Sequence, residues 1–290
     1  MPQKSDTSTP RTTQHNEAEL RERFNPEGSP LRQMQLRMVD IMKDIDNFCN
    51  AHGLRYWLSS GTLLGAVRHG GFIPWDDDVD LEMPLSDYKK FLEIAARELP
   101  SHLALQIHST DKYYFFPYAK VRDLRSHLSE VTGIDRHYKY RGIFVDIFAT
   151  KCCNRHLQWL SYKIQLNCLI RPAKYIKAKW FHTFLIGIYH IVSGIYKLFG
   201  LLDKMLGSKE RRLVYGCAYN NPFRPDDVIY PLKRITFEGM EFSSPNDIDG
   251  YLRNMFGDYM RLPDLDKVPI HAGEITFYDK QEQETNPKDK

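Results

Sequence analysis

Residues 61–82 read GTLLGAVRHGGFIPWDDDVDLE. This stretch holds a glycine-rich turn, a segment of one short helix, and then four aspartates in five positions followed by a glutamate. Asp78, Asp80 and Glu82 alternate with apolar residues. In a β-strand, residues two apart point to the same face. The pattern therefore predicts a strand that presents three carboxylates on one face and buries Val79 and Leu81 behind them.

Carboxylates held side by side repel each other unless a cation lies between them. Oxygen ligands suit Mg²⁺ or Mn²⁺, and Mg²⁺ held by one or two carboxylates usually completes its shell with water and a phosphate. Asp78, Asp80 and Glu82 are thus candidate metal ligands. The alternative is a solvated acidic turn, but a turn explains neither the alternation with apolar residues nor the glycines upstream.

The residues before the acidic strand predict a phosphate site. A short strand over 56–58 leads into the glycine turn, and a helix over 62–68 begins there. Because N–H groups at a helix start bind phosphate, Gly61 and Thr62 are candidate substrate-binding residues. Arg68 could reach the same phosphates, or it could simply stabilise the end of the helix.

Trp75, just before the acids, could stack on a base or on a quaternary ammonium group. Packing against the protein is the alternative, and the one that we favour for an isolated tryptophan.

Three residues further along the chain are candidates for the same site. Asp146 stands alone in the apolar run GIFVDIF (142–148), and a buried carboxylate must be paired, coordinated or protonated. Backbone N–H groups could satisfy it instead. Lys120 and Arg122 share one face of a predicted strand, where they could stabilise the charge of a pyrophosphate. A solvated edge strand is the alternative for these two cations.

With SGTLLG at 60–65, then Arg68, then FIPWDDDVD at 72–80, the sequence closely resembles the LicD family. That family includes bacterial phosphocholine transferases and, more distantly, fukutin-type ribitol-phosphate transferases. They are divergent nucleotidyltransferases, whose pattern is Gly-Ser/Thr, a short helix and Asp-x-Asp on a strand. The resemblance runs from about residue 31 to 277. It implies a third carboxylate from a neighbouring strand, which Asp146 fits and for which Glu82 is the rival.

The expected fold class is α/β (α+β): a nucleotidyltransferase-like mixed sheet flanked by helices, with an added helical region. Apolar periodicity and breakers predict helices and strands along the chain. The predicted helices cover 31–51, 62–68, 86–99 (capped by Ser86 or Asp87) and 247–256. The predicted strands cover 56–58, 79–83, 104–107, 115–121 and 142–148, with a hairpin over 233–242 that turns at Glu238-Gly239.

The chain of 290 residues suits one large domain with an addition. The expected divisions are a disordered tail (1–30), a catalytic core (31–155), a basic and apolar helical insertion (156–213), the C-terminal part of the catalytic domain (214–280) and a flexible tail (281–290). The N-terminal stretch has no secretory signal pattern. The five scattered cysteines do not suggest a disulfide framework. A cytoplasmic setting is therefore expected.

Net charge and hydropathy restrict the classes of partner that the sequence predicts. The net charge of +3 gives no reason to expect nucleic acid. The stretch 147–202 contains no Asp or Glu, and 180–202 is strongly apolar. This segment predicts a pair of apolar helices, on the protein or at a membrane interface where basic residues favour anionic lipid. An internal helical layer and a spanning helix are the alternatives. The protein could thus lie peripherally on the inner face of the membrane.

The functional hypothesis is a metal-dependent phosphotransferase. Asp78, Asp80 and Asp146 would be catalytic and would hold Mg²⁺ or Mn²⁺ against a donor pyrophosphate. The resemblance, not the residue pattern, implies a CDP-activated donor, most plausibly CDP-choline, and a sugar hydroxyl on a glycan or lipid-linked precursor as acceptor, as in lipopolysaccharide biosynthesis. The alternatives are a nucleotidyltransferase that releases pyrophosphate and a catalytically silent membrane-associated scaffold.

Overall fold

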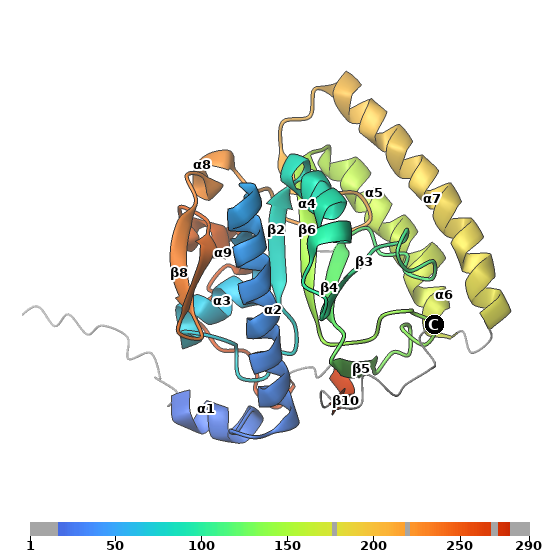
Figure 1. Ribbon diagram of the computed structural model, residues 1–290. Helices are drawn as coiled ribbons and strands as arrows, with labels where there is room; N and C mark the ends of the chain where they lie inside the picture. Colours follow the sequence, from blue (N-terminus) through green and yellow to red (C-terminus); the bar gives the residue numbers. More distant parts are fainter. Residues whose placement is uncertain (1–16, 176–178, 218–220, 268–271, 279–290) are drawn as a thin grey trace, which may run out of the picture.

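The computed structural model describes residues 17–175, 179–217, 221–267 and 272–278 (Figure 1). The predicted C-terminal tail, 281–290, and the first sixteen residues lie outside this description. Helices and strands mix around one central sheet, which confirms the predicted fold class.

The central sheet is mixed in direction. Its strands β2 and β6 run parallel, whereas the other neighbours are antiparallel. A sixth strand, β7 (Arg211–Leu213), pairs with the end of β6. The main strands in spatial order are β1 (Trp57–Leu58), β2 (Asp80–Pro84), β6 (Phe144–Cys152), β4 (Ala119–Asp123) and β3 (Leu103–Gln106).

One face of this sheet is the hydrophobic core. Leu81, Val121 and Ile147, from three neighbouring strands, are each at most 1% exposed. Helices α2 (Pro30–His52) and α4 (Leu85–Glu98) pack against the sheet and lie in front of it in Figure 1. Because side chains alternate along each strand, the polar residues between these apolar ones face the other way.

The ends of α2 follow from its sequence. The Ser29 side chain accepts a hydrogen bond from the Arg32 N–H, proline stands in the first turn, and Gly53 closes the helix in the left-handed conformation. The predicted cap of α4 is wrong. Pro84 holds the N-cap position without a side-chain hydrogen bond, and Asp87 is instead ion-paired with Arg55.

A second group of elements packs beside the β1 end of the sheet. Helix α3 (Ser60–His69) contacts α9 (Ile248–Phe256) and the hairpin of β8 (Lys233–Phe237) and β9 (Met240–Ser244). The short helix α8 (Asp226–Ile229) contacts α9. The hairpin turns at Glu238 and Gly239, both with positive φ, as a two-residue turn requires.

The N-terminal prediction is wrong for residues 17–30. Helix α1 (Glu17–Phe24) lies in the stretch expected to be disordered, and Pro30 already belongs to α2. Leu20 is buried, and Glu17 contacts the His69 ring at 2.7 Å. These tertiary contacts supply the stabilisation that the polar sequence of α1 lacks.

The region after β6 is a helical layer. It consists of α5 (Arg155–Gln165), a π-helical turn η1 (Leu166–Ile170), α6 (Arg171–Lys174) and α7 (Lys179–Leu206). The predicted pair of apolar helices is wrong, since α7 is one continuous helix through Gly187 and Gly194. Among the described residues, Trp180–Leu206 is the one helix long and apolar enough to cross a membrane, and 17% of its most apolar window is buried.

A small two-stranded sheet completes the fold. Strand β5 (Ser126–Glu130) pairs antiparallel with β10 (Ala272–Phe277). Because β5 follows β4 directly, this small sheet brings the far end of the chain next to the central sheet.

The packing of α4 on α2 gives a test of the core. The rings of Phe91 and Phe48 lie 5.5 Å apart, and Phe91 is fully buried. We expect Phe91→Ala to lower the free energy of unfolding by about 3–5 kcal/mol, because it leaves a cavity. Urea unfolding measures this. Glu93→Ala, exposed on the same helix, should change stability by about 0.5 kcal/mol or less. Equal losses in both variants would contradict this account of the core.

Candidate active site

The register of three strands brings charged residues together on the face opposite the core. Asp146 of β6 lies directly between Asp80 of β2 and Lys120 of β4. Side chains of directly opposed residues point to the same face of a sheet. The predicted grouping of Asp80, Asp146 and Lys120 therefore follows from the strand pairing itself.

Lys120 and Asp146 form a buried ion pair. The Lys120 Nζ donates to both carboxylate oxygens of Asp146, at 2.7 and 3.0 Å. The same ammonium lies 3.4 Å from the centre of the Phe144 ring. Burial raises the pKa of Asp146 from its usual value, and the positive charge of Lys120 opposes that rise. Asp146 is thus the paired buried carboxylate that its apolar surroundings predicted.

Asp80 and Asp76 are buried next to other carboxylates, which repel their negative charge. Burial raises the pKa of Asp80 well above its usual value, and the charges of Asp78, Asp146 and Asp76 add to the rise. The pKa of Asp76 is raised in the same way, by burial and then by Asp78 and Asp77. The sequence did not predict Asp76 as a site residue, because Asp76 precedes the predicted strand over 79–83. Its place in the run of four aspartates was the available signal.

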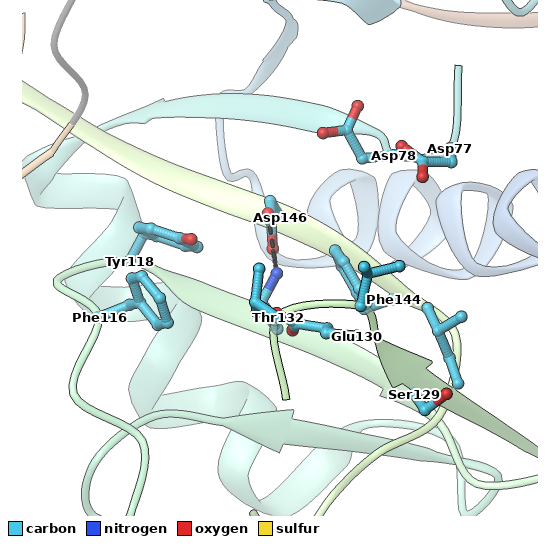
Figure 2. Close-up of a pocket in the computed structure, with 12 residues that line it drawn as sticks. Asp77, Asp78, Phe116, Tyr118, Ser129, Glu130, Thr132, Phe144 and Asp146 are labelled. Atoms are coloured by element: carbon cyan, nitrogen blue, oxygen red, sulfur yellow. Dashed lines mark hydrogen bonds and ion pairs between the residues drawn. The ribbon is translucent and has the colours of Figure 1, made fainter. Parts of the chain in front are cut away.

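A pocket of about 400 Å³ is lined by Asp78, Asp146 and Lys120, whereas Asp76 and Asp80 lie outside its lining. Figure 2 shows Asp146 in its centre, Phe116 and Tyr118 to one side, Phe144 and Ser129 to the other, and Asp77 and Asp78 at one end. The chain segment after β4 forms the remaining wall. The lining residues are Asp77, Asp78, Phe116, Tyr118, Lys120, Leu128, Ser129, Glu130, Val131, Thr132, Phe144 and Asp146.

The candidate ligand oxygens are of the type that a hard cation prefers, but their positions in the structure do not form a metal site. Asp78, Asp80 and Asp146 offer only oxygen, as Mg²⁺ and Mn²⁺ prefer. Burial and the neighbouring carboxylates raise the pKa of Asp80, and the positive charge of Lys120 offsets only part of that rise. Within the described residues, however, no three His, Cys, Asp or Glu side chains converge on one point. Binding a metal therefore requires the carboxylates to turn, and Asp146 to share its oxygens with Lys120.

Glu82 has a different partner. Its carboxylate accepts hydrogen bonds from Arg224 Nε and Nη2, the shortest at 2.7 Å, and from Ser59 Oγ at 2.7 Å. Glu82 and Arg224 are 1% and 2% exposed. These bonds neutralise Glu82 where it stands, so the contacts favour Asp146 over Glu82 as the third acid of the site. Arg224, far along the chain, was not recognised in the sequence.

The glycine turn holds the acidic segment in place. The Thr62 hydroxyl accepts a hydrogen bond from the Asp80 N–H at 2.9 Å. A Cβ on Gly61 would lie 2.8 Å from Asp76 Oδ2. Ser60 has φ +47°, a strained conformation for a residue other than glycine. Gly61 and Thr62 contact the acidic segment, and neither belongs to the pocket lining.

The other predicted binding residues do not line the pocket, although Arg122 contacts two residues that do, Phe144 and Glu130. Arg68 donates to the Tyr259 carbonyl at 3.1 Å, and burial lowers its pKa. Arg122 is fully buried and donates to the Gln106 side chain and to the Gly142 carbonyl. The Trp75 ring packs on Phe24, with the ring centres 5.1 Å apart. The structure therefore brings only Lys120, of the predicted binding residues, into the pocket lining.

The Glu82–Arg224 pair can be tested apart from catalysis. We expect Arg224→Met to lower the free energy of unfolding by about 3–5 kcal/mol, because it leaves a buried carboxylate without its partner. Adding Glu82→Gln should recover part of that loss in a double-mutant cycle. The measurement is chemical unfolding, with Mg²⁺ titration of each variant. If Glu82→Gln abolished metal binding while leaving stability unchanged, Glu82 would be a ligand instead.

Comparison with known proteins covers most of the chain. A family model described as the LicD/FKTN/FKRP nucleotidyltransferase domain matches residues 53–177. The chain is 26% identical over 264 residues to the lipopolysaccharide cholinephosphotransferase LicD of Haemophilus influenzae, a match that covers 84% of this chain and 97% of that protein.

Other relatives match over shorter stretches of the chain. The human ribitol 5-phosphate transferase FKRP is 65% identical over 37 residues, which are 13% of this chain and 8% of that protein. Mannosyltransferase regulator 4 of Saccharomyces cerevisiae is 33% identical over 75 residues, which are 26% of this chain and 6% of that protein. The domain match and the nearly full-length likeness to LicD agree with the observed sheet and acidic cluster. Residues 53–177 therefore match the LicD/FKTN/FKRP nucleotidyltransferase domain, and the likeness to LicD extends over most of the chain.

Proposed function

We propose that this protein transfers a phospho-alcohol from a CDP-activated donor to a sugar hydroxyl of a cell-surface glycan precursor. The observation that carries the proposal is the alignment of Asp80, Asp146 and Lys120 on three neighbouring strands beside the pocket. Support for the reaction class comes from the likeness to a lipopolysaccharide cholinephosphotransferase and, over 37 residues, to a ribitol 5-phosphate transferase.

The proposed reaction is a displacement at phosphorus. The acceptor hydroxyl oxygen attacks the phosphorus that bears the alcohol, and the bond from that phosphorus to the CMP oxygen breaks. CMP leaves with the electron pair. The hydroxyl proton passes to one of the two site carboxylates that line the pocket, Asp78 or Asp146.

The aspartates and Lys120 have different electrostatic roles in the proposed reaction. Asp78, Asp80 and Asp146 would hold Mg²⁺ or Mn²⁺, which when bound supplies positive charge to the donor pyrophosphate. Lys120, whose ammonium is already fixed by Asp146, stabilises negative charge on the phosphoryl oxygens. Asp76 adds to the negative field that attracts the cation.

The pocket lining supports choline as the transferred alcohol. Phe116, Tyr118 and Phe144 present aromatic faces, and Glu130 adds a carboxylate. Aromatic faces attract quaternary ammonium groups. The same rings already lie close to an ammonium, since Lys120 Nζ is 3.4 Å from the Phe144 ring centre and 5.5 Å from that of Tyr118. CDP-choline is therefore the proposed donor.

A glycan precursor carried on a lipid is the proposed acceptor, which would place the protein at the inner face of a membrane. The name of the Haemophilus influenzae relative supports a lipopolysaccharide-type acceptor. A soluble sugar that mimics the precursor's end serves for assay.

The metal site predicts an unusual effect on stability. The raised pKa of Asp80 means that folding disfavours its charged form. Asp80→Asn should therefore raise the melting temperature of the metal-free protein at neutral pH, and abolish both turnover and the stabilisation by Mg²⁺. The gain should shrink as the pH falls through the raised pKa of the folded state and vanish below about 3.9, where the carboxyl is protonated in both states.

Thermal melts with and without MgCl₂ measure this effect. Asp203 is the matched control, because its pKa is lowered by hydrogen bonds from Tyr215 and Lys151. Asp203→Asn should destabilise the protein and leave its response to Mg²⁺ intact. Near-normal turnover in Asp80→Asn and in Asp78→Asn would overturn the metal mechanism.

The donor is identified by incubation with CDP-choline, CDP-ethanolamine, CDP-glycerol and CDP-ribitol, with Mg²⁺ and a sugar acceptor. CMP release supports group transfer, whereas pyrophosphate release from CTP would mean nucleotidyl transfer. Tyr118→Leu should raise the KM for CDP-choline by about 2- to 30-fold, because a cation–π contact is worth about 0.5–2 kcal/mol. The KM for neutral CDP-glycerol should stay unchanged. An equal rise for both donors would remove Tyr118 from choline recognition.

A further inference from the structure

Helix α7 has two unlike faces. One face packs on the protein through Leu185, Val192 and Phe199, which are all buried. The opposite face carries large apolar side chains that are exposed, among them Trp180 at 73% and Met205 at 82%. Figure 1 shows α7 along the outer side of the molecule, with α5 and α6 between it and the sheet.

The exposed residues follow a regular spacing. They recur at steps of three, four or seven, which places them on one side of a helix. Gly187 and Gly194 fall on the same side, and a Cβ on either would contact nothing within 4 Å. We call these exposed large residues the α7 apolar surface: Trp180, Phe184, Ile191, Leu198, Leu201 and Met205. A continuous apolar surface on a folded chain marks a contact with a partner or a membrane.

The charges beside this surface are all basic. Lys197 and Lys204 of α7 are exposed, whereas its single acid, Asp203, is buried. Asp203 accepts hydrogen bonds from Lys151 Nζ at 3.0 Å and from the Asn154 N–H at 2.8 Å. The sequence from 147 to 202 has no other acid to offset the lysines. An apolar surface on a helix that exposes lysines and buries its one acid matches anionic lipid.

The contacts of the buried face of α7 determine the orientation in which α7 could bind a bilayer. Its buried face holds polar groups bonded to the protein, including the His182 ring, 3.2 Å from the Tyr113 carbonyl. A helix that spans the bilayer would need lipid, or apolar partners, on every side. With one face packed and hydrogen-bonded to the domain, α7 can enter the interface only along its length, which is about 42 Å for its 28 residues.

We propose that the α7 apolar surface docks flat on an anionic lipid bilayer, with its lysines at the headgroups. This inference goes beyond the proposed transfer reaction, since it does not depend on which group is transferred. A second copy of the chain is the less favoured occupant. Two such helices would bring lysines together with no exposed carboxylate on α7 to pair them.

Flotation with lipid vesicles tests the proposal. The full chain should float with phosphatidylcholine vesicles that contain phosphatidylglycerol, and more weakly with phosphatidylcholine alone. Raising the salt from 0.1 to 1 M should weaken binding, because the Debye length falls from about 10 Å to about 3 Å. Lys197→Gln with Lys204→Gln should remove most of the preference for anionic vesicles.

The decisive variant combines Phe184→Ser, Ile191→Ser and Leu198→Ser, which should reduce the bound fraction about tenfold. These side chains are exposed, so unfolding curves should match those of the wild type. Leu36→Ser, Phe256→Ser and Met260→Ser together form the control, because they remove three exposed apolar residues elsewhere. CMP release with a soluble sugar acceptor should be unchanged in both variants. This separates membrane docking from the transfer reaction.

Three results would overturn the docking surface. The wild type could stay in the soluble fraction with every vesicle. The α7 variant could bind as well as the wild type. Light scattering could show a wild-type dimer that the α7 variant converts to a monomer without any change in vesicle binding, which would assign the surface to a second copy.

Discussion

The pairing of β2, β6 and β4 is the constraint on which the rest of the structure depends. It sets Asp80, Asp146 and Lys120 side by side on one face and Leu81, Ile147 and Val121 on the other. Because the side-chain period of a strand is two, a slip of one residue would exchange the faces. The core under α2 and α4 and the charged face beside the pocket are therefore fixed by the same register.

The buried acidic residues of the protein fall into two groups that differ in whether a cation neutralises them. Glu82 is neutralised by Arg224, and Asp203 by Lys151, so these acids hold distant segments together. The acids around Asp80 lie near Lys120 and Arg68, yet burial and mutual repulsion still raise the pKa values of Asp80 and Asp76. Charge left uncompensated in a folded protein is typical of a site that binds something. This contrast separates the structural carboxylates from those of the candidate active site.

The helical layer and the pocket share one segment of chain. Phe115 packs in a cluster with Leu185 and Val192 of α7, while its neighbour Phe116 lines the pocket. The α7 layer thus supports one wall of the pocket through its buried face and leaves its apolar surface outward. In the proposed docking, the helix that would contact the bilayer also supports one wall of the pocket.

The sequence alone determined the fold class, the acidic strand and, within two residues, the bounds of α2, α3, α4 and α9, since alternation, helical periodicity and glycine turns are local signals. It also singled out Asp146, because a lone acid in an apolar strand must have a partner. Only the tertiary structure decided which partner each charge takes: Arg224 reaches Glu82 from 142 residues away, and Arg122 is buried against Gln106. It also decided that α1 is a helix and that α7 is continuous. These outcomes depend on contacts between distant segments, whose energies no local pattern of residues contains.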